Sequence, residues 1–205
     1  MPKYVERALA RFNHPIPGNP QHQPHQHAIP MYGTTVQNAK PEDTSHSYLP
    51  LRKKYIQEVI GTFLYYGCAV DSTMLTSLSA IASAQAEPTE ETITRCKPFL
   101  DYPATPQDTI LTYKASDMVL VVHSDASYLS KPKARNQAGG YFFLSSDCDD
   151  PANNGAVLNL AQLIKDVMSS TAEAELGALY INAREAVPQG GKQKWILIND
   201  KKKTN

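Results

Sequence analysis

The chain has no excess charge of either sign, few cysteines and no long apolar segment. Its 205 residues contain 20 Lys and Arg against 20 Asp and Glu, so no global positive field draws in a polyanion and any nucleic-acid binding has to be local. The widely spaced Cys68, Cys96 and Cys148 exclude a CxxC zinc finger and favour a reducing compartment. The longest apolar stretch, Ile60 to Val70, is too short to cross a bilayer core of about 30 Å, and the N-terminus lacks a signal-like apolar region. We therefore expect an intracellular protein, cytoplasmic or nuclear, with no membrane partner.

The N-terminal part combines a short helical pattern with a segment of biased composition. Lys3 to Phe12 has apolar residues at helical spacing. From His14 to Tyr48 the chain is dense in Pro, Gln, His, Ser and Thr, and it has too few apolar residues to offset the entropy of ordering. We expect residues 1–48 to form a short helix followed by an extended or flexible connector.

Residues 49–108 carry three amphipathic patterns that predict a small packed helical unit. The helices are expected over Pro50 to Tyr66, from a cap at Asp71 or Ser72 to Glu87-Pro88, and from Thr89 to Pro103. The residues expected to face inward are Tyr55, Ile56, Val59, Ile60, Phe63 and Leu64, then Met74, Leu75, Leu78, Ile81 and Ala82, then Ile93, Cys96, Phe99 and Leu100.

Residues 109–205 change to the period of β-strands. Short β-prone runs at 109–113, 119–123, 140–144 and 156–160 are separated by turn residues, which is typical of an antiparallel meander. A capped helix start at 169–176 and a last apolar run at 195–198 follow. The predicted order is β, β, β, α, β, which makes the whole chain α+β.

Three carboxylates lie at positions that a fold of this order could bring close together. The apolar run from Met118 to Val122 ends in His123-Ser124-Asp125, Glu175 lies in the first turns of the helix, and Asp200 follows the last strand. Two divalent cations about 4 Å apart need several acids from different elements. Asp125, Glu175 and Asp200 therefore form a candidate metal and catalytic site. An acid after a strand is also a common turn former, and this alternative stays open for Asp125 and especially for Asp200.

The choice between Glu173 and Glu175 depends on helix capping. The apolar stripe Ala172, Leu176, Leu179 and Ala183 leaves both glutamates at similar angles. With Ser170 as N-cap, Glu173 occupies the position that completes a capping box, which gives it a structural role. Glu175 is then the expected metal ligand. His123 shares a strand face with Asp125, and we favour a packing role for it over a role as general base.

These motifs resemble those of the ribonuclease H domain of copia-type retrotransposon polyproteins. Ser124-Asp125-Ala126 is similar to the family's strand-end motif, Gly139-Gly140-Tyr141 to its next strand, and Ser169 to Glu175 to its helix start with two acids. Tyr55 to Tyr66, followed by Ala69-Val70-Asp71, is similar to the reverse transcriptase thumb and connection segment that precedes this domain. The resemblance implies metal-binding roles for Asp125 and Glu175, and the remainder of the reverse transcriptase polyprotein as a partner.

The resemblance implies an α+β fold in which a helical thumb/connection segment, 49–108, precedes an incomplete ribonuclease H-like mixed sheet with a crossing helix, 109–205. The chain has no Tyr-x-Asp-Asp hairpin, so we expect no polymerase active site in it. After Val187 it leaves the family pattern, and nothing after Asn205 would supply the remaining helices and last strand.

The activity implied for an intact version is hydrolysis of the RNA strand of an RNA/DNA hybrid with two Mg²⁺ (or Mn²⁺) ions held by Asp125, Glu175 and a third acid, Asp200. Two alternatives stay open. The chain could be an inactive remnant or a domesticated nucleic-acid-binding or protein-binding module, or residues 49–110 could act as a helical docking unit.

Overall fold

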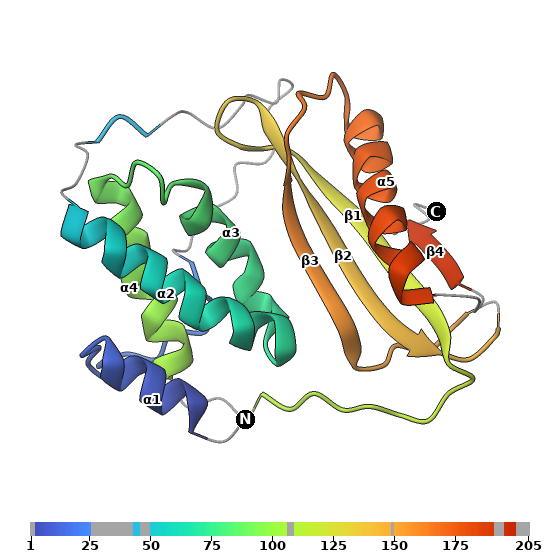
Figure 1. Ribbon diagram of the computed structural model, residues 1–205, viewed down its shortest axis with the longest axis horizontal. Coiled ribbons are helices and arrows are strands. Elements are labelled where there is room, and N and C mark those ends of the chain that lie inside the picture. The colour runs from blue at the N-terminus through green and yellow to red at the C-terminus, as the bar shows by residue number, and fades with distance from the viewer. Residues whose placement is uncertain are drawn as a thin grey trace. The chain divides into compact units, whose positions relative to one another are not determined.

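The computed structural model describes residues 3–25, 43–45, 50–105, 109–148, 150–190 and 195–199. They divide into two compact units, of which unit 1 holds the described residues up to Ile110 and unit 2 those from Leu111 onward. Figure 1 shows helices in unit 1, and a sheet with one helix in unit 2.

Unit 1 is a packed set of helices whose ends follow local capping. It contains α1 (Tyr4–Arg11), α2 (Pro50–Ala69), the 3-10 turn η1 (Ser72–Met74), α3 (Leu75–Ser83) and α4 (Glu90–Ala104). Asp71 caps η1 by accepting a bond from the Thr73 amide, and Thr89 caps α4 in a capping box with Thr92. The expected helices are confirmed, although α3 ends earlier than predicted.

The core of unit 1 consists of the inward stripes of α2, α3 and α4. Phe63 and Phe99 pack edge to face with ring centroids 5.5 Å apart. Leu64, predicted to face inward, is instead 46% exposed. The buried apolar residues of α2, η1, α3 and α4 are Ile56, Val59, Ile60, Phe63, Met74, Leu75, Leu78, Ile81, Cys96, Phe99, Leu100 and Tyr102.

The described part of the connector, residues 13–25, has neither helix nor strand, as predicted. It is nevertheless attached to α4. His14 Nε2 lies 2.8 Å from Asp101 Oδ1, and the Gln21 amide donates to Thr105 Oγ1 over 2.8 Å. Most of the remaining connector lies outside the described residues.

Unit 2 is a mixed sheet crossed by one long helix. The strands β1 (Val119–Lys131), β2 (Arg135–Ser145), β3 (Ala156–Ile164) and β4 (Trp195–Asn199) lie in the order β3-β2-β1-β4, and α5 (Thr171–Gly190) runs between β3 and β4 in the chain. β1 pairs antiparallel with β2 and parallel with β4. The α+β class is therefore confirmed, and from β1 onward the elements follow the order β, β, β, α, β.

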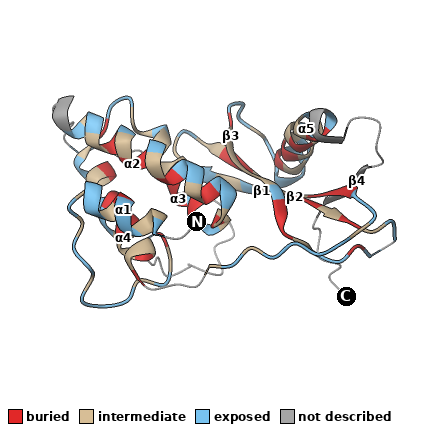
Figure 2. Ribbon diagram, turned by 60° about the horizontal axis from the view of Figure 1, so that its bottom comes forward, coloured by how far each residue is buried: buried red, intermediate tan, exposed pale blue. Residues whose placement is uncertain are grey.

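The two faces of the sheet differ in what they contact. Leu120 and Val122 of β1 form a cluster with Phe142 and with Ala186 of α5. Successive strand residues point to opposite faces, so Val121 and His123 lie on the other face, where the His123 ring is 5.3 Å from that of Phe143. Figure 2 shows buried residues where α5 faces the sheet.

The strand predicted at 109–113 is wrong. Residues 109–118 have no regular secondary structure. Two of them bind at the start of β3. Tyr113 Oη donates to the Ala156 carbonyl over 3.0 Å, and the Lys114 amide donates over 2.7 Å to Oδ1 of Asn154, which precedes the strand. The run does not join the backbone ladder of the sheet.

The predicted inner stripe of α5 is also wrong. Leu176 is 66% exposed and Ala172 is exposed. The face that packs on the sheet is made of smaller residues, Ala174, Ala178, Asn182 and Ala186. Their side chains allow the helix backbone to approach the sheet closely.

Candidate functional site

Asp125 lies on the central strand immediately after the buried segment of β1. Residues 119–122 and Ser124 are buried, whereas Asp125 is exposed. Its cross-strand partner in β2 is Gly139, and the parallel ladder with β4 ends one residue earlier, at Ser124 and Asn199. The carboxylate therefore stands in solvent at the point where β4 stops pairing with β1.

The orientation of Asp125 follows from its neighbour. Ser124 Oγ accepts a 2.8 Å hydrogen bond from Asn182 Nδ2 of α5, so Ser124 faces the helix. Because side chains alternate along a strand, the Asp125 side chain starts from the opposite face. It begins on the face of the sheet opposite α5, the helix that carries Glu175.

Glu173 has the structural role expected from capping, with one difference. Its amide donates to Ser170 Oγ over 3.2 Å, while its carboxylate accepts from the amide and the hydroxyl of Ser169, over 2.6 and 2.7 Å. The capping partner is thus Ser169 rather than the Ser170 amide. These bonds from Ser169, the hydroxyl first, lower the pKa of Glu173.

Glu175 lies beside the row of small residues that faces the sheet. It is half-buried between buried Ala174 and exposed Leu176, and its Oε2 atom is shielded from solvent. Of the two glutamates in this turn, Glu175 is therefore the one held toward the interior. A partly buried carboxylate is a suitable ligand for a cation that keeps several of its waters.

The third predicted ligand, Asp200, lies outside the described residues. Among the residues that the structure does describe, no three His, Cys, Asp or Glu side chains are grouped so that they could hold a metal ion. The set Asp125, Glu175 and Asp200 therefore stays a prediction, with two members placed on packed elements of one unit.

Sequence reasoning missed a buried polar cluster next to Asp125. Asn182 Nδ2 donates both to Ser124 Oγ and to the Gly139 carbonyl, each over 2.8 Å. A Cβ atom on Gly140 would lie 2.1 Å from Asn182 Oδ1, so only glycine leaves room for the amide. An asparagine that interrupts a row of alanines at four-residue spacing is the signal that could have revealed this cluster.

The tip of the β1–β2 hairpin concentrates positive charge. Lys131 and Arg135 are cross-strand partners, and Lys133 and Ala134 between them have φ values of 61° and 52°. Like charges on opposite strands and non-glycine residues in the left-handed region are both unfavourable. An anionic partner at this tip would offset the charge repulsion.

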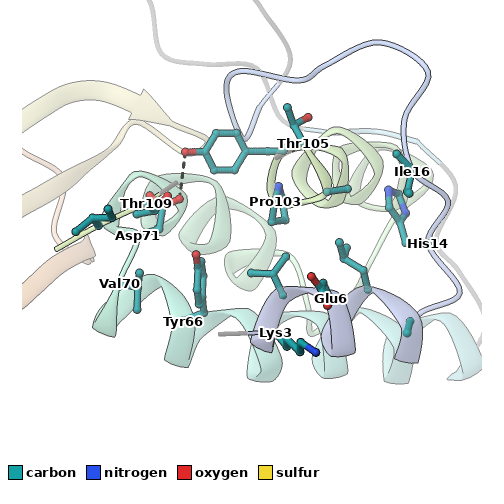
Figure 3. Close-up of a pocket in the computed structure, with 16 residues that line it drawn as sticks. Lys3, Glu6, His14, Ile16, Tyr66, Val70, Asp71, Pro103, Thr105 and Thr109 are labelled. Carbon is teal, nitrogen blue, oxygen red and sulfur yellow. Dashed lines mark hydrogen bonds between the residues drawn. The ribbon is translucent and has the colours of Figure 1, made fainter. Parts of the chain in front are cut away.

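A cavity of about 660 Å³ lies within unit 1. Figure 3 shows Tyr66 and Asp71 at one end and His14 and Ile16 at the other. Tyr102 Oη donates to Asp71 Oδ2 over 3.1 Å, and burial, followed by the charge of Asp71, raises the pKa of Tyr66. Asp71 here serves the turn between α2 and α3, and the cavity shares no lining residue with the acids of unit 2.

The chain matches no protein-family model, no curated protein and no solved structure. The likeness to the copia-type ribonuclease H domain therefore depends on the residues quoted above. In the part of the chain that is described, no helix combines the length and the apolar character needed to span a membrane.

Proposed function

We propose that unit 2 is a ribonuclease H-like nuclease domain that hydrolyses the RNA strand of RNA/DNA hybrids. The observation that carries this proposal is the place of α5 in the chain. The helix follows the antiparallel strands β1 to β3 and leads into β4, which lies beside β1 in the sheet. This connection brings a helix with Glu175 in its first turns against the strand that presents Asp125. Ligands in mixed sheets commonly lie at such strand ends.

Mg²⁺ fits the donors that the two acids offer. It usually keeps several waters and binds through one or two carboxylates, and carboxylates at an exposed strand position and a shielded helix position can provide these. Bound there, the metal would supply an activated water and stabilise the leaving oxygen. Asp125 and Glu175 would orient it, and Asp200 is the candidate third ligand.

The charged hairpin supports nucleic-acid binding by a chain with no net charge. The formal charge of the whole sequence is zero, so phosphates have to be held by a local cluster. Lys131, Lys133 and Arg135 form one within unit 2. Replacing all three by Glu should weaken hybrid binding and reduce its salt dependence, while the same change at Arg52, Lys53 and Lys54 of α2 is the matched control.

The nuclease proposal is tested with the purified chain, Mg²⁺ and a labelled RNA/DNA hybrid. Asp125→Asn and Glu175→Gln should abolish cleavage of the RNA strand. Glu173→Gln changes an acid in the same helical turn whose role is capping, and it should keep cleavage. Equal cleavage by the parent chain and Asp125→Asn would rule out this site.

The orientation of Asp125 favours a second candidate, a binding module without catalysis. Its side chain leaves β1 on the face opposite α5, which is unfavourable for a metal shared with Glu175. A catalytic site should raise the midpoint of thermal unfolding when Mg²⁺ is added, because metal binds only the folded state. Hybrid binding with neither this stabilisation nor cleavage identifies the binding module.

A further inference from the structure

The face of α5 that packs on the sheet is a row of four fully buried residues at four-residue spacing. Three are alanines, Ala174, Ala178 and Ala186, and the fourth is Asn182. The row therefore presents almost the same small surface in each turn, and Asn182 is its one polar member.

Packing of the alanine row by itself leaves the position of α5 along the sheet weakly specified. Ala186 contacts a cluster that includes Leu120, Val122 and Phe142, and Ala178 contacts another that includes Ala138 and Ile164. A slide by one turn, about 5.4 Å, would replace one alanine by another in most of these contacts. Packing of the alanine row therefore tolerates such a shift, although Ile181 of α5, which packs against the second cluster, would be displaced from it.

Asn182 does not tolerate the shift. Its Nδ2 donates to Ser124 Oγ and to the Gly139 carbonyl over 2.8 Å each, and Gly140 provides the space that its Oδ1 occupies. Moved by one turn, the amide would enter either apolar cluster, where burial of an amide without these partners is unfavourable. Its hydrogen bonds are satisfied in one register.

The partners of Asn182 also border Asp125. Ser124 precedes Asp125 in β1, and Gly139 is its cross-strand partner in β2. The amide thus fixes α5 to the two residues next to the acid. Glu175 lies two turns before Asn182 on the same helix, so this attachment also sets the position of Glu175 along β1.

We propose that Asn182 is a positioning residue that sets the register of α5 on the sheet, and with it the level of Glu175 relative to Asp125. The consequence for metal binding depends on the proposed nuclease function. A slide of about 5.4 Å exceeds the spacing of about 4 Å between two catalytic ions, so one register serves them.

Disulfide trapping reports the register without reference to activity. The exposed Cys68 and Cys148 are replaced by serine and the buried Cys96 is kept. Cysteines at Ala126 and Ala178, which belong to one packed cluster, report the native register, and cysteines at Ala126 and Ala174 report a slide by one turn. In the parent chain the first pair should form and the second should not.

Removing the amide together with its hydroxyl partner, Asn182→Ala with Ser124→Ala, should raise the ratio of slipped to native cross-link by about tenfold, as expected when a hydrogen bond stops favouring one register. Tyr180→Ala, on the exposed side of the same helix, should leave the ratio unchanged. An unchanged ratio in the Asn182→Ala/Ser124→Ala chain overturns the proposal.

A second variant moves the amide instead of removing it, and it keeps the proposal testable if the first variant fails to fold. Ala178→Asn with Asn182→Ala should pull α5 by one turn, so that cysteines at Ala126 and Ala174, which do not cross-link in the parent chain, now form a disulfide. Absence of that cross-link in a folded chain overturns the proposal. Cross-links as expected in a parent chain that never cleaves a hybrid support the register inference and reject only the nuclease function.

Discussion

At the scale of single residues, two neighbouring glycines in β2 should respond differently to the same substitution. A Cβ on Gly140 would meet Asn182 Oδ1 at 2.1 Å and Phe142 Cε2 at 2.8 Å, whereas a Cβ on Gly139 would meet only the Asp125 carbonyl, at 3.8 Å. We expect Gly140→Ala to lower the free energy of unfolding by about 1–3 kcal/mol, because the core has to be rearranged. Gly139→Ala should be neutral or slightly stabilising.

Urea unfolding of the two variants provides the measurement. Combining Gly140→Ala with Asn182→Ala should recover part of the loss, since the clashing oxygen is removed. Equal unfolding midpoints for the two single variants would contradict the close approach of Asn182 to β2.

The pH dependence of stability should reveal the cap at the start of α5. Bonds from Ser169 lower the pKa of Glu173 below 4.5 in the folded chain. A group with a lowered folded pKa stabilises the protein above its unfolded pKa, and this contribution is lost as the pH falls through the folded value. The difference in unfolding free energy between the parent and Glu173→Gln should be constant near neutral pH and vanish in acid. A difference that persists at low pH would show that the cap does not depend on the charge.

Residue-scale features differ in how far the sequence predicts them. The capping role of Glu173 was predictable because it depends on residues within one turn. The cluster of Asn182, Ser124 and Gly139 joins positions more than 40 apart in the chain, and only the fold brings them together. The same applies to the exposure of Asp125, since alternation fixes the opposite directions of Ser124 and Asp125 but not which direction faces α5.

At the scale of elements, substitutions on the two sides of α5 should show which face of the helix is buried. Leu176 is 66% exposed and Ala178 is fully buried against Ala138. Leu176→Ala should change the unfolding free energy by less than about 0.5 kcal/mol. Ala178→Leu should cost about 1–3 kcal/mol because the close approach to the sheet leaves no room. A large change in unfolding free energy for Leu176→Ala and a small one for Ala178→Leu would show that the stripe expected from the sequence, which includes Leu176, is the buried face.

The error in the predicted stripe has a physical origin. Sequence patterns give most weight to large apolar residues, and α5 places Leu176, Tyr180 and Val187 on its outer side. Burial of α5 instead follows the small residues that permit close packing.

The helices of unit 1 were predictable because Phe63, Met74 and Phe99 are both large and buried. Residues 109–113 are rich in β-prone residues, but pairing depends on a free ladder position that the sequence does not specify.

At the scale of the whole molecule, the two units should unfold as separate transitions. Each has its own core, with Phe63 fully buried in unit 1 and Phe142 fully buried in unit 2. Trp195, the one tryptophan of the sequence, belongs to β4 of unit 2, so its fluorescence reports that unit. Helical circular dichroism reports both units.

Matched Phe→Ala substitutions distinguish the units because each removes the same side chain from a fully buried site, at a cost of about 3–5 kcal/mol. Phe142→Ala should shift the unfolding transition seen by Trp195 fluorescence to lower urea. Phe63→Ala should leave that transition in place and shift only the circular dichroism. If both substitutions move the fluorescence transition equally, the units unfold together, and loss of the helices of unit 1 would also disrupt the strand that carries Asp125.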